Sequence, residues 1–251
     1  MAAYYNEFDP FAAAWLRELI KDGLIADGVV DERSITEVEP NDIKEFTQCH
    51  FFAGIGGWSL AARLAGWPDD RPMWTGSPPC QPFSVAGSKK GKDDSRHLWP
   101  EFFRLIGESK PKVVFGEQVV TAINHGWLDE VHNDFERANY SFAEVCIEAT
   151  VYGAHHKRER LFFVGHSNSD RCEKGSETSK AAGQGHPINT ANWYDVKSAE
   201  FSDGKRRVIP NEPSLFPLAN GLPNRVGLLR GAGNAIVPQV AAEVIKAYIA
   251  Y

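Results

Sequence analysis

Hydrophobic and polar residues follow one another in blocks that predict strands and helices in alternation. An apolar segment from Cys49 leads through a glycine-rich turn into helically spaced apolar positions up to residue 67. Further strands are predicted at 72–77, 111–119, 141–153 and 160–165, and further helices at 98–109 and 127–138. Strands alternating with helices, with a glycine turn after the first strand, predict an α/β fold with a largely parallel sheet.

The same pattern divides the chain into three regions. Residues 1–45 carry helical spacing over 10–25, with a proline to open the helix and a glycine to close it, and are expected to form a helical N-terminal appendage. Residues 46–165 together with 225–251 form the predicted α/β domain. Residues 166–224 are rich in serine, asparagine, glycine and proline, which predicts a small, loop-rich domain.

Composition and charge narrow the class of protein. The 251 residues are 43% hydrophobic, enough for a full core, and no apolar run is long enough to span a membrane. We therefore expect a soluble, cytoplasmic protein. The net charge is −6, but residues 1–45 hold eleven acidic and four basic residues (−7), so the rest of the chain is near +1. The overall acidity thus does not exclude a nucleic-acid partner.

Two segments near the predicted sheet carry candidate chemistry. The turn Phe52-Ala53-Gly54-Ile55-Gly56-Gly57 lies between a strand and a helix, where glycines let a ligand approach the backbone; such turns also serve tight packing. Cys80 lies in the proline-rich segment 78–84 after the next strand. It is either a small buried residue in a rigid turn or a nucleophilic thiolate at the carboxyl edge of the sheet. The four cysteines form no C-x-x-C pair, which argues against a disulfide framework and a zinc site.

Two further segments place charge near the same edge. Glu117 follows the apolar strand at 111–116, and the basic run 152–160 precedes another strand. Arg158 and Arg160 would share one face of an extended segment, which suits recognition of a phosphate or a base oxygen, although a solvated charge run is the ordinary explanation. No third ligand accompanies the adjacent histidines at motif spacing, so we expect no metal.

Taken in order, these motifs resemble the DNA cytosine-5 methyltransferases. FFAGIGG is similar to the family's cofactor motif, PPCQPFS to its catalytic-cysteine motif and GEQV to its Glu-Asn-Val motif. HHKRER resembles the Gln-x-Arg-x-Arg motif, GAGNAIVPQVA the carboxy-terminal cofactor motif, and GSKKGKDDSRHLW the catalytic loop. The resemblance covers roughly residues 49–165 and 227–249 and implies a Rossmann-like fold that binds S-adenosyl-L-methionine (AdoMet), with residues 166–224 as the target-recognition domain.

The resemblance also implies a role for each matching residue. Cys80 would attack carbon 6 of a flipped cytosine, Glu117 would protonate ring nitrogen 3, Arg160 would contact the oxygen at carbon 2, and Arg158 would orient Arg160 or a phosphate. The cofactor pocket would include Phe52, Gly54, Gly56, Gly57, Pro79, Asn234 and Ala235. Double-stranded DNA would be contacted by Gln81, Ser84, Lys89, Lys90, Arg96, His156, Arg206 and Arg207. A monomer on DNA is expected, with a role in restriction-modification or in a phage or prophage.

The sequence departs from the family pattern at three places. Gln118 stands where the family has asparagine, and His156 where it has glutamine. Only 22 residues separate Gly57 from Cys80, so the two strand–helix units that normally supply an acidic residue for the ribose and an aspartate for the adenine are missing or replaced. The N-terminal region could replace them, and Asp69 or Asp70 could contact the ribose.

Three alternatives remain open at this point. The same covalent activation of cytosine could serve a one-carbon donor other than AdoMet. The chain could be a DNA-binding homologue without catalysis. A nicotinamide-dependent oxidoreductase would explain the glycine turn but gives no role to Cys80, Glu117 or the arginines.

Overall fold

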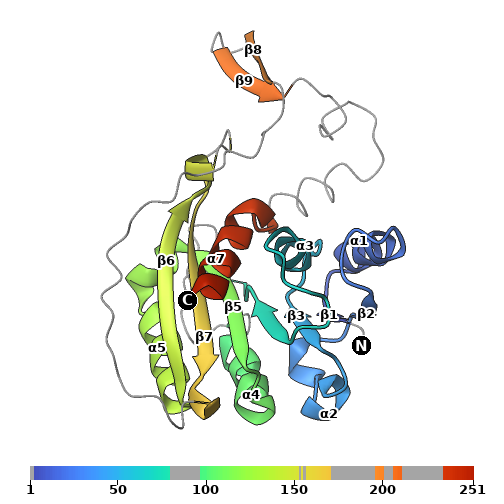
Figure 1. Ribbon diagram of the computed structural model, residues 1–251, viewed down its shortest axis with the longest axis vertical. Helices are drawn as coiled ribbons and strands as arrows, with labels where there is room; N and C mark the ends of the chain where they lie inside the picture. The colour runs from blue at the N-terminus through green and yellow to red at the C-terminus, as the bar shows by residue number, and fades with distance from the viewer. Residues whose placement is uncertain are drawn as a thin grey trace.

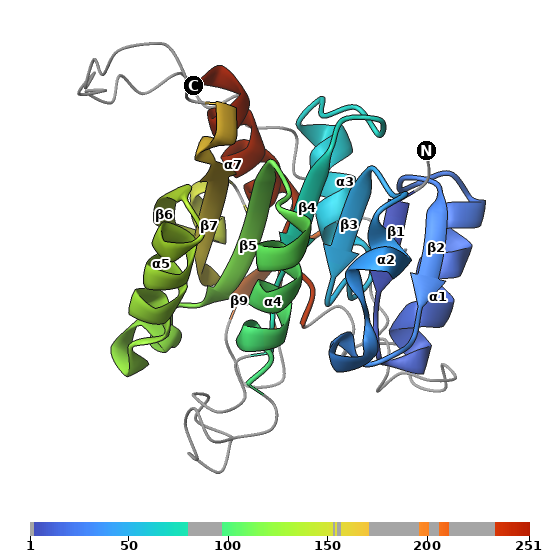
Figure 2. The same cartoon turned by 90° about the horizontal axis from the view of Figure 1, so that it is seen from below.

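A seven-stranded sheet forms the centre of the molecule, in the order β2-β1-β3-β4-β5-β7-β6 (Figures 1 and 2). The computed structural model describes residues 3–79, 97–152, 154, 157–170, 196–200, 206–210 and 234–251. The sheet strands are β1 (Ala3–Asn6), β2 (Gly28–Asp31), β3 (Gln48–Phe51), β4 (Met73–Gly76), β5 (Val113–Val119), β6 (Tyr140–Glu148) and β7 (Glu159–Ser167). Strands β2, β1, β3, β4 and β5 run parallel, while β7 is antiparallel to both β5 and β6. The predicted α/β fold with a largely parallel sheet is confirmed.

Helices cover both faces of the sheet. They are α1 (Pro10–Lys21), α2 (Pro40–Ile43), α3 (Gly57–Leu64), α4 (Trp99–Ser109), α5 (Trp127–Arg137) and α7 (Pro238–Ala250). Figure 2 shows α1, α3 and α7 on one face and α2, α4 and α5 on the other. Separate apolar clusters fill the two sides: one packs α3 and α7 against β5 and β7, and another packs α2, α4 and α5 against β3 to β5. The chain therefore forms three layers, with helices on either side of the sheet.

The N-terminal region differs from the expectation of a helical appendage. It does contain the predicted helix α1, but it also supplies two strands: β1 pairs with the outer side of β3, and β2 pairs with β1. In the common doubly wound order 3-2-1-4-5, the strand with the glycine turn comes first in the chain. Here that strand is β3, and the two positions on its outer side are filled by β1 and β2, which precede it in the chain. The sheet positions expected to be missing or replaced are thus occupied by residues 3–31.

A buried polar layer holds β1 against the rest of the sheet. The Tyr5 hydroxyl donates to the Ala26 carbonyl (2.6 Å) and lies 3.0 Å from the hydroxyl of Ser59 on α3. Its ring stacks on His50 of β3, whose Nδ1 lies 2.8 Å from the Thr75 hydroxyl of β4. Burial lowers the pKa of His50 to about 3, so the imidazole is neutral at physiological pH. These contacts hold residues 3–31, which we call the N-terminal unit, against α3.

The remaining described elements are short or peripheral. Strands β8 (Val196–Glu200) and β9 (Arg206–Pro210) form a two-stranded antiparallel sheet inside the region that the sequence assigns to target recognition. The 3-10 segments are η1 (Ile35–Glu37), η4 (Val120–His125), η5 (Ala149–Tyr152) and η6 (Asn168–Asp170). Within the described part of the chain, no helix is long and apolar enough to cross a membrane.

Candidate active site

Several of the predicted site residues that the structure describes gather where the parallel strands end. Phe51, Gly76 and Gly116 stand opposite one another in β3, β4 and β5. The glycine turn, the segment Ser77–Pro79 and Glu117 all follow these positions, so they meet at the carboxyl edge of the sheet. This edge is where open α/β sheets bind their ligands.

Glu117 forms the buried centre of the candidate site. Its side chain lies on the same face of the sheet as Arg160, because Arg160 is paired with Val119, two residues further along β5. Glu117 is 8% exposed, and its Oε1 lies 2.8 Å from Arg160 Nε. Burial raises the pKa of Glu117, while the charges of Arg160 and Arg158 oppose that rise. A buried carboxyl group with a raised pKa is suited to hold and donate a proton.

Arg158 links this centre to the carboxy-terminal segment. Its Nη2 donates to the Ala235 carbonyl at 2.8 Å, across a sequence separation of 77 residues. Burial lowers the pKa of Arg158, the nearby Arg160 adds to that effect, and Glu117 opposes it. The structure therefore brings the basic segment and the carboxy-terminal segment before α7 together, with Arg158 joining them.

The segment leading into Cys80 is held by two side chains. Gln118 Nε2 donates to the Pro78 carbonyl at 3.0 Å, and Trp58 Nε1 donates to the Ser77 hydroxyl at 3.1 Å. Pro78 is buried and Pro79 is exposed. The residue that replaces the family's asparagine thus has a clear contact here, with the backbone two residues before Cys80.

The three glycines of the glycine turn have different roles. Gly54 has a φ of +55° and open space where a side chain would begin. In contrast, Gly56 packs against Ile25 of the N-terminal unit, and a Cβ on Gly57 would lie 2.7 Å from Ile236 before α7. Gly54 is therefore the glycine open to a ligand, whereas Gly56 and Gly57 allow close packing.

Phe52 and Asn234 complete the described part of the predicted pocket. Phe52 adopts a φ of 51°, which is uncommon for a side-chain-bearing residue, and its ring meets Phe102 edge-on. Asn234 is exposed at the start of the carboxy-terminal segment that leads into α7.

Glu7 is a further candidate site residue, which the sequence motifs do not indicate. It follows β1, and its carboxylate accepts the Gly54 amide at 2.7 Å and the Asp9 amide at 2.9 Å. The preceding residue of the turn, Ala53, also donates its amide to the Asn6 carbonyl at 3.0 Å. An acidic residue after the strand beside the glycine-turn strand is where dinucleotide-binding folds contact a ribose. Its position before Cys49 in the chain concealed it, since the signal was sought between the glycine turn and Cys80.

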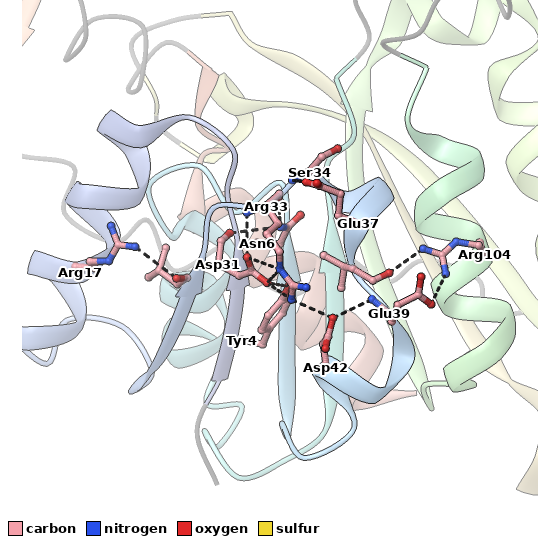
Figure 3. A network of polar contacts seen from close by, with 12 residues as sticks. Tyr4, Asn6, Arg17, Asp31, Arg33, Ser34, Glu37, Glu39, Asp42 and Arg104 are labelled. Atoms are coloured by element: carbon pink, nitrogen blue, oxygen red, sulfur yellow. Dashed lines mark hydrogen bonds and ion pairs between the residues drawn. The ribbon is translucent and has the colours of Figure 1, made fainter.

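The acidic residue at the end of β2 is engaged differently. Asp31 accepts hydrogen bonds from the Tyr4 hydroxyl (2.8 Å) and from Arg33 Nη2 (2.7 Å), and Arg33 also pairs with Asp42 at 3.0 Å (Figure 3). Asp31 is thus neutralised within the protein and ties β2 to α2. The two residues named for the ribose contact, Asp69 and Asp70, instead lie in the connection that precedes β4, at the opposite edge of the sheet, where Asp69 pairs with Arg63 at 2.8 Å.

Several predicted residues lie outside the described part of the chain. These are Cys80, Gln81, Ser84, Lys89, Lys90, Arg96 and His156. Arg206 and Arg207 open strand β9, and the structure describes their backbone. Among the residues it does describe, no group of three or more histidine, cysteine, aspartate or glutamate side chains is placed to hold a metal ion.

Comparison with known proteins identifies the family. A family model described as C-5 cytosine-specific DNA methylase matches residues 67–214, which is more than half of the chain. The chain belongs to the C-5 cytosine-specific DNA methylase family. The match begins after the glycine turn and includes the Cys80 segment, Glu117 and both arginines of this methylase chain.

Individual relatives agree with this assignment. The methylase chain is 40% identical over 96 residues to the type II methyltransferase M.AplI of Arthrospira platensis, covering 38% of this chain and 28% of that relative. It is 40% identical over 90 residues to M.HhaI of Haemophilus parahaemolyticus, covering 34% and 28% respectively. The aligned parts are therefore well under half of these relatives.

One solved structure resembles the whole fold. The Entamoeba histolytica methyltransferase EhMeth superposes with a TM-score of 0.53 at 14% identity, over 98% of this chain and 97% of that one. At this level of identity the comparison speaks to the fold alone. It supports a Rossmann-like methyltransferase architecture for this methylase chain.

Proposed function

We propose that this protein is a DNA cytosine-5 methyltransferase that uses AdoMet as its methyl donor. The observation that carries the proposal is the buried Glu117, paired with Arg160 at the end of β5 beside the segment that leads into Cys80. A protonatable carboxyl group, a guanidinium and an adjacent cysteine are the groups needed to activate a pyrimidine ring toward electrophiles.

The chemistry begins with covalent activation of the base. Carbon 5 of cytosine is a weak nucleophile, so the Cys80 thiolate forms a bond to carbon 6 and the ring electrons move toward carbon 5 and nitrogen 3. Glu117 donates a proton to nitrogen 3 as this charge develops, and its raised pKa favours the protonated form that can do so. After methylation, water takes the proton from carbon 5, the bond between carbon 6 and sulfur breaks to release the Cys80 thiolate, and nitrogen 3 returns its proton to Glu117, which restores the aromatic ring.

The two arginines have different roles in the proposed site. Arg160 contacts Glu117 and lies on the same sheet face, from where its guanidinium also reaches the oxygen on carbon 2 of the base. Arg158 acts through the Ala235 carbonyl, which keeps the carboxy-terminal segment next to this face. Arg158 is therefore a positioning residue in this proposal, and Arg160 a catalytic one.

Residues beside the glycine turn fit AdoMet, although the strand–helix unit that normally supplies the acidic residue for the ribose is missing between Gly57 and Cys80. The cofactor supplies an electrophilic methyl group to carbon 5. Glu7 would bind the ribose hydroxyls, because each oxygen accepts one backbone amide and retains a further lone pair. Gly54 leaves open space for the ligand, and Phe8, 73% exposed, provides an aromatic surface for the adenine. An acidic residue in this place weakens the reason to invoke a different donor.

The DNA contacts follow from the location of the chemistry. The target base is inaccessible inside a duplex, so it must rotate out of the helix into the site. We propose that Gln81, Ser84, Lys89, Lys90, Arg96 and His156 contact the DNA around the flipped base, and that residues 166–224, with Arg206 and Arg207 on β9, read the target sequence.

Mass spectrometry of nucleosides tests this function. DNA from cells that express the protein should contain cytosine heavier by one methyl group, and this product should be absent with Cys80→Ala. Cys146→Ala, which removes an exposed cysteine on β6, is the matched control and should leave the product unchanged. A cytosine of a different added mass would point to another donor. Absence of modified cytosine, together with failure to form a covalent adduct with 5-fluorocytosine DNA, would exclude the enzyme in favour of a DNA-binding homologue.

A further inference from the structure

Two side chains hold the segment before Cys80 from opposite faces of the sheet. Trp58 reaches Ser77 from α3, on the face that also carries Glu117. Gln118 follows Glu117 in β5, so its side chain points to the other face, where it reaches the Pro78 carbonyl. Trp58 is 4% exposed and Gln118 is 3% exposed. The Gln118–Pro78 hydrogen bond is therefore shielded from water, which strengthens it, whereas the Trp58–Ser77 bond is partly buried.

The composition of the segment makes these contacts important. Pro78 and Pro79 have no backbone N–H, so their amides cannot anchor the segment to its neighbours. The buried Pro78 carbonyl instead receives its hydrogen bond from the Gln118 amide. That amide is itself held, because Gln118 Oε1 accepts the Val119 N–H at 2.9 Å, leaving Nε2 to face Pro78.

We infer that Gln118 and Trp58 are positioning residues that set where Cys80 stands relative to Glu117. This inference rests on the proposed function. Gln118 adjoins the acid in β5 and holds the carbonyl two residues before the nucleophile, so one hydrogen bond ties the segment before Cys80 to β5. Trp58 ties the same segment to the helix that follows the glycine turn.

The Gln118 side chain is longer than the asparagine of the family motif. Asparagine, the residue found in the family motif at this position, is shorter by one carbon–carbon bond, about 1.5 Å. From the same backbone position its amide would lie beyond hydrogen-bond distance of the Pro78 carbonyl. We therefore expect that restoring the family residue impairs this enzyme. A displacement of about 1 Å at a reacting group can cost about 100-fold in rate.

The chain contains a matched control for each contact. Gln48 Nε2 donates to the Pro68 carbonyl at 3.0 Å, and Trp67 Nε1 donates to the Arg71 carbonyl at 3.0 Å. The side chains of Gln48 and Trp67 are buried, but they lie around the connection that precedes β4, away from the carboxyl edge of the sheet. Gln48→Asn and Trp67→Phe therefore remove similar hydrogen bonds without touching the Cys80 segment.

The experiment compares Gln118→Asn, Gln118→Met and Trp58→Phe with the two control variants and the wild type. For each protein, kcat, the KM for AdoMet and the KM for DNA are measured, together with the rate of adduct formation on 5-fluorocytosine DNA and the Tm. The methionine variant keeps the length and volume of Gln118 but removes its donor.

We expect kcat and the adduct rate to fall at least about tenfold in both Gln118 variants, and by a smaller factor in Trp58→Phe, with both KM values unchanged. The control variants should keep kcat within about twofold of wild type even where their Tm falls. If the wild type is active and the Gln118 variants form the adduct at the same rate, this inference alone is wrong. The same holds if the control variants lose as much kcat as the Gln118 and Trp58 variants. A wild type that forms no adduct overturns the proposed function and this inference with it.

Discussion

Glu7→Gln tests whether the N-terminal unit forms part of the cofactor pocket. The substitution keeps the size of the side chain but removes its charge and replaces one acceptor oxygen with an NH2 group. That group would face either the Gly54 amide or the Asp9 amide, each of which now donates to the carboxylate. A hydrogen bond to a charged acceptor contributes about 1.5–3 kcal/mol. Loss of one such bond to a ribose hydroxyl corresponds to a Kd for AdoMet that is weaker by about 10- to 150-fold.

Isothermal titration calorimetry with AdoMet measures this effect directly. Glu37→Gln is the matched control, because Glu37 is also an acidic residue of the N-terminal region that accepts a backbone amide, that of Ser34 at 3.0 Å. Burial raises the pKa of Glu7, opposed by its two backbone donors, so the ionised form that accepts ribose hydroxyls is lost as the pH falls through that pKa. Wild-type affinity should fall in the same direction, and Glu7→Gln should not follow it. Equal Kd values for AdoMet in the wild type and Glu7→Gln would refute the assignment.

Three other substitutions and one matched control test the surroundings of the site. Because burial raises the pKa of Glu117, the folded state binds its proton more tightly than the unfolded state, and this group lowers stability as the pH rises through the unfolded pKa toward the folded one. In urea denaturation at pH 4 and pH 7, Glu117→Gln should therefore gain stability relative to wild type at the higher pH; a constant difference would contradict this. Gly116→Ala should lower the free energy of unfolding by more than about 2 kcal/mol, since its Cβ would lie within an aromatic ring of β7, whereas Gly107→Ala, in open space on α4, should raise it by about 0.5–1 kcal/mol. Arg158→Lys should weaken AdoMet binding about tenfold by losing the bond to Ala235, and an unchanged Kd would show that this contact does not position the cofactor segment.

The sequence predicted the main sheet well because its strands carry strong patterns. The run ending at Glu117 is apolar and long, and the glycine turn after β3 marks a strand–helix junction, so both were placed correctly. Strands β3 and β4 are as short as β1 and β2, but the glycine turn and the proline-rich segment that follow them mark their ends. Strands β1 and β2 carry no such signal, and the helical spacing of α1 dominates between them, so they were missed.

The candidate site was predictable where it depends on local motifs and not where it depends on strand order. Arg160 was assigned to the same face as Arg158 from alternation alone, and the structure pairs it with Glu117. Glu7 could not be found in this way, because its role depends on β1 lying beside β3, and pairing between strands is not encoded in the spacing of either one. Likewise, nothing in the sequence relates the Gln118 side chain to Pro78, which lies 40 residues away.

Because β1 lies between β2 and β3, one of its edges stays unpaired for part of the time that the chain is being synthesised. Strand β1 can pair with β2 as soon as α1 has folded, but its other edge has no partner until β3 is made. An unpaired strand edge is a template for association with other chains. The end of β2 at Asp31 and the start of β3 at Gln48 are 17 residues apart (48 minus 31). At a synthesis rate of roughly 10 residues per second, the nascent protein exposes that edge for about two seconds.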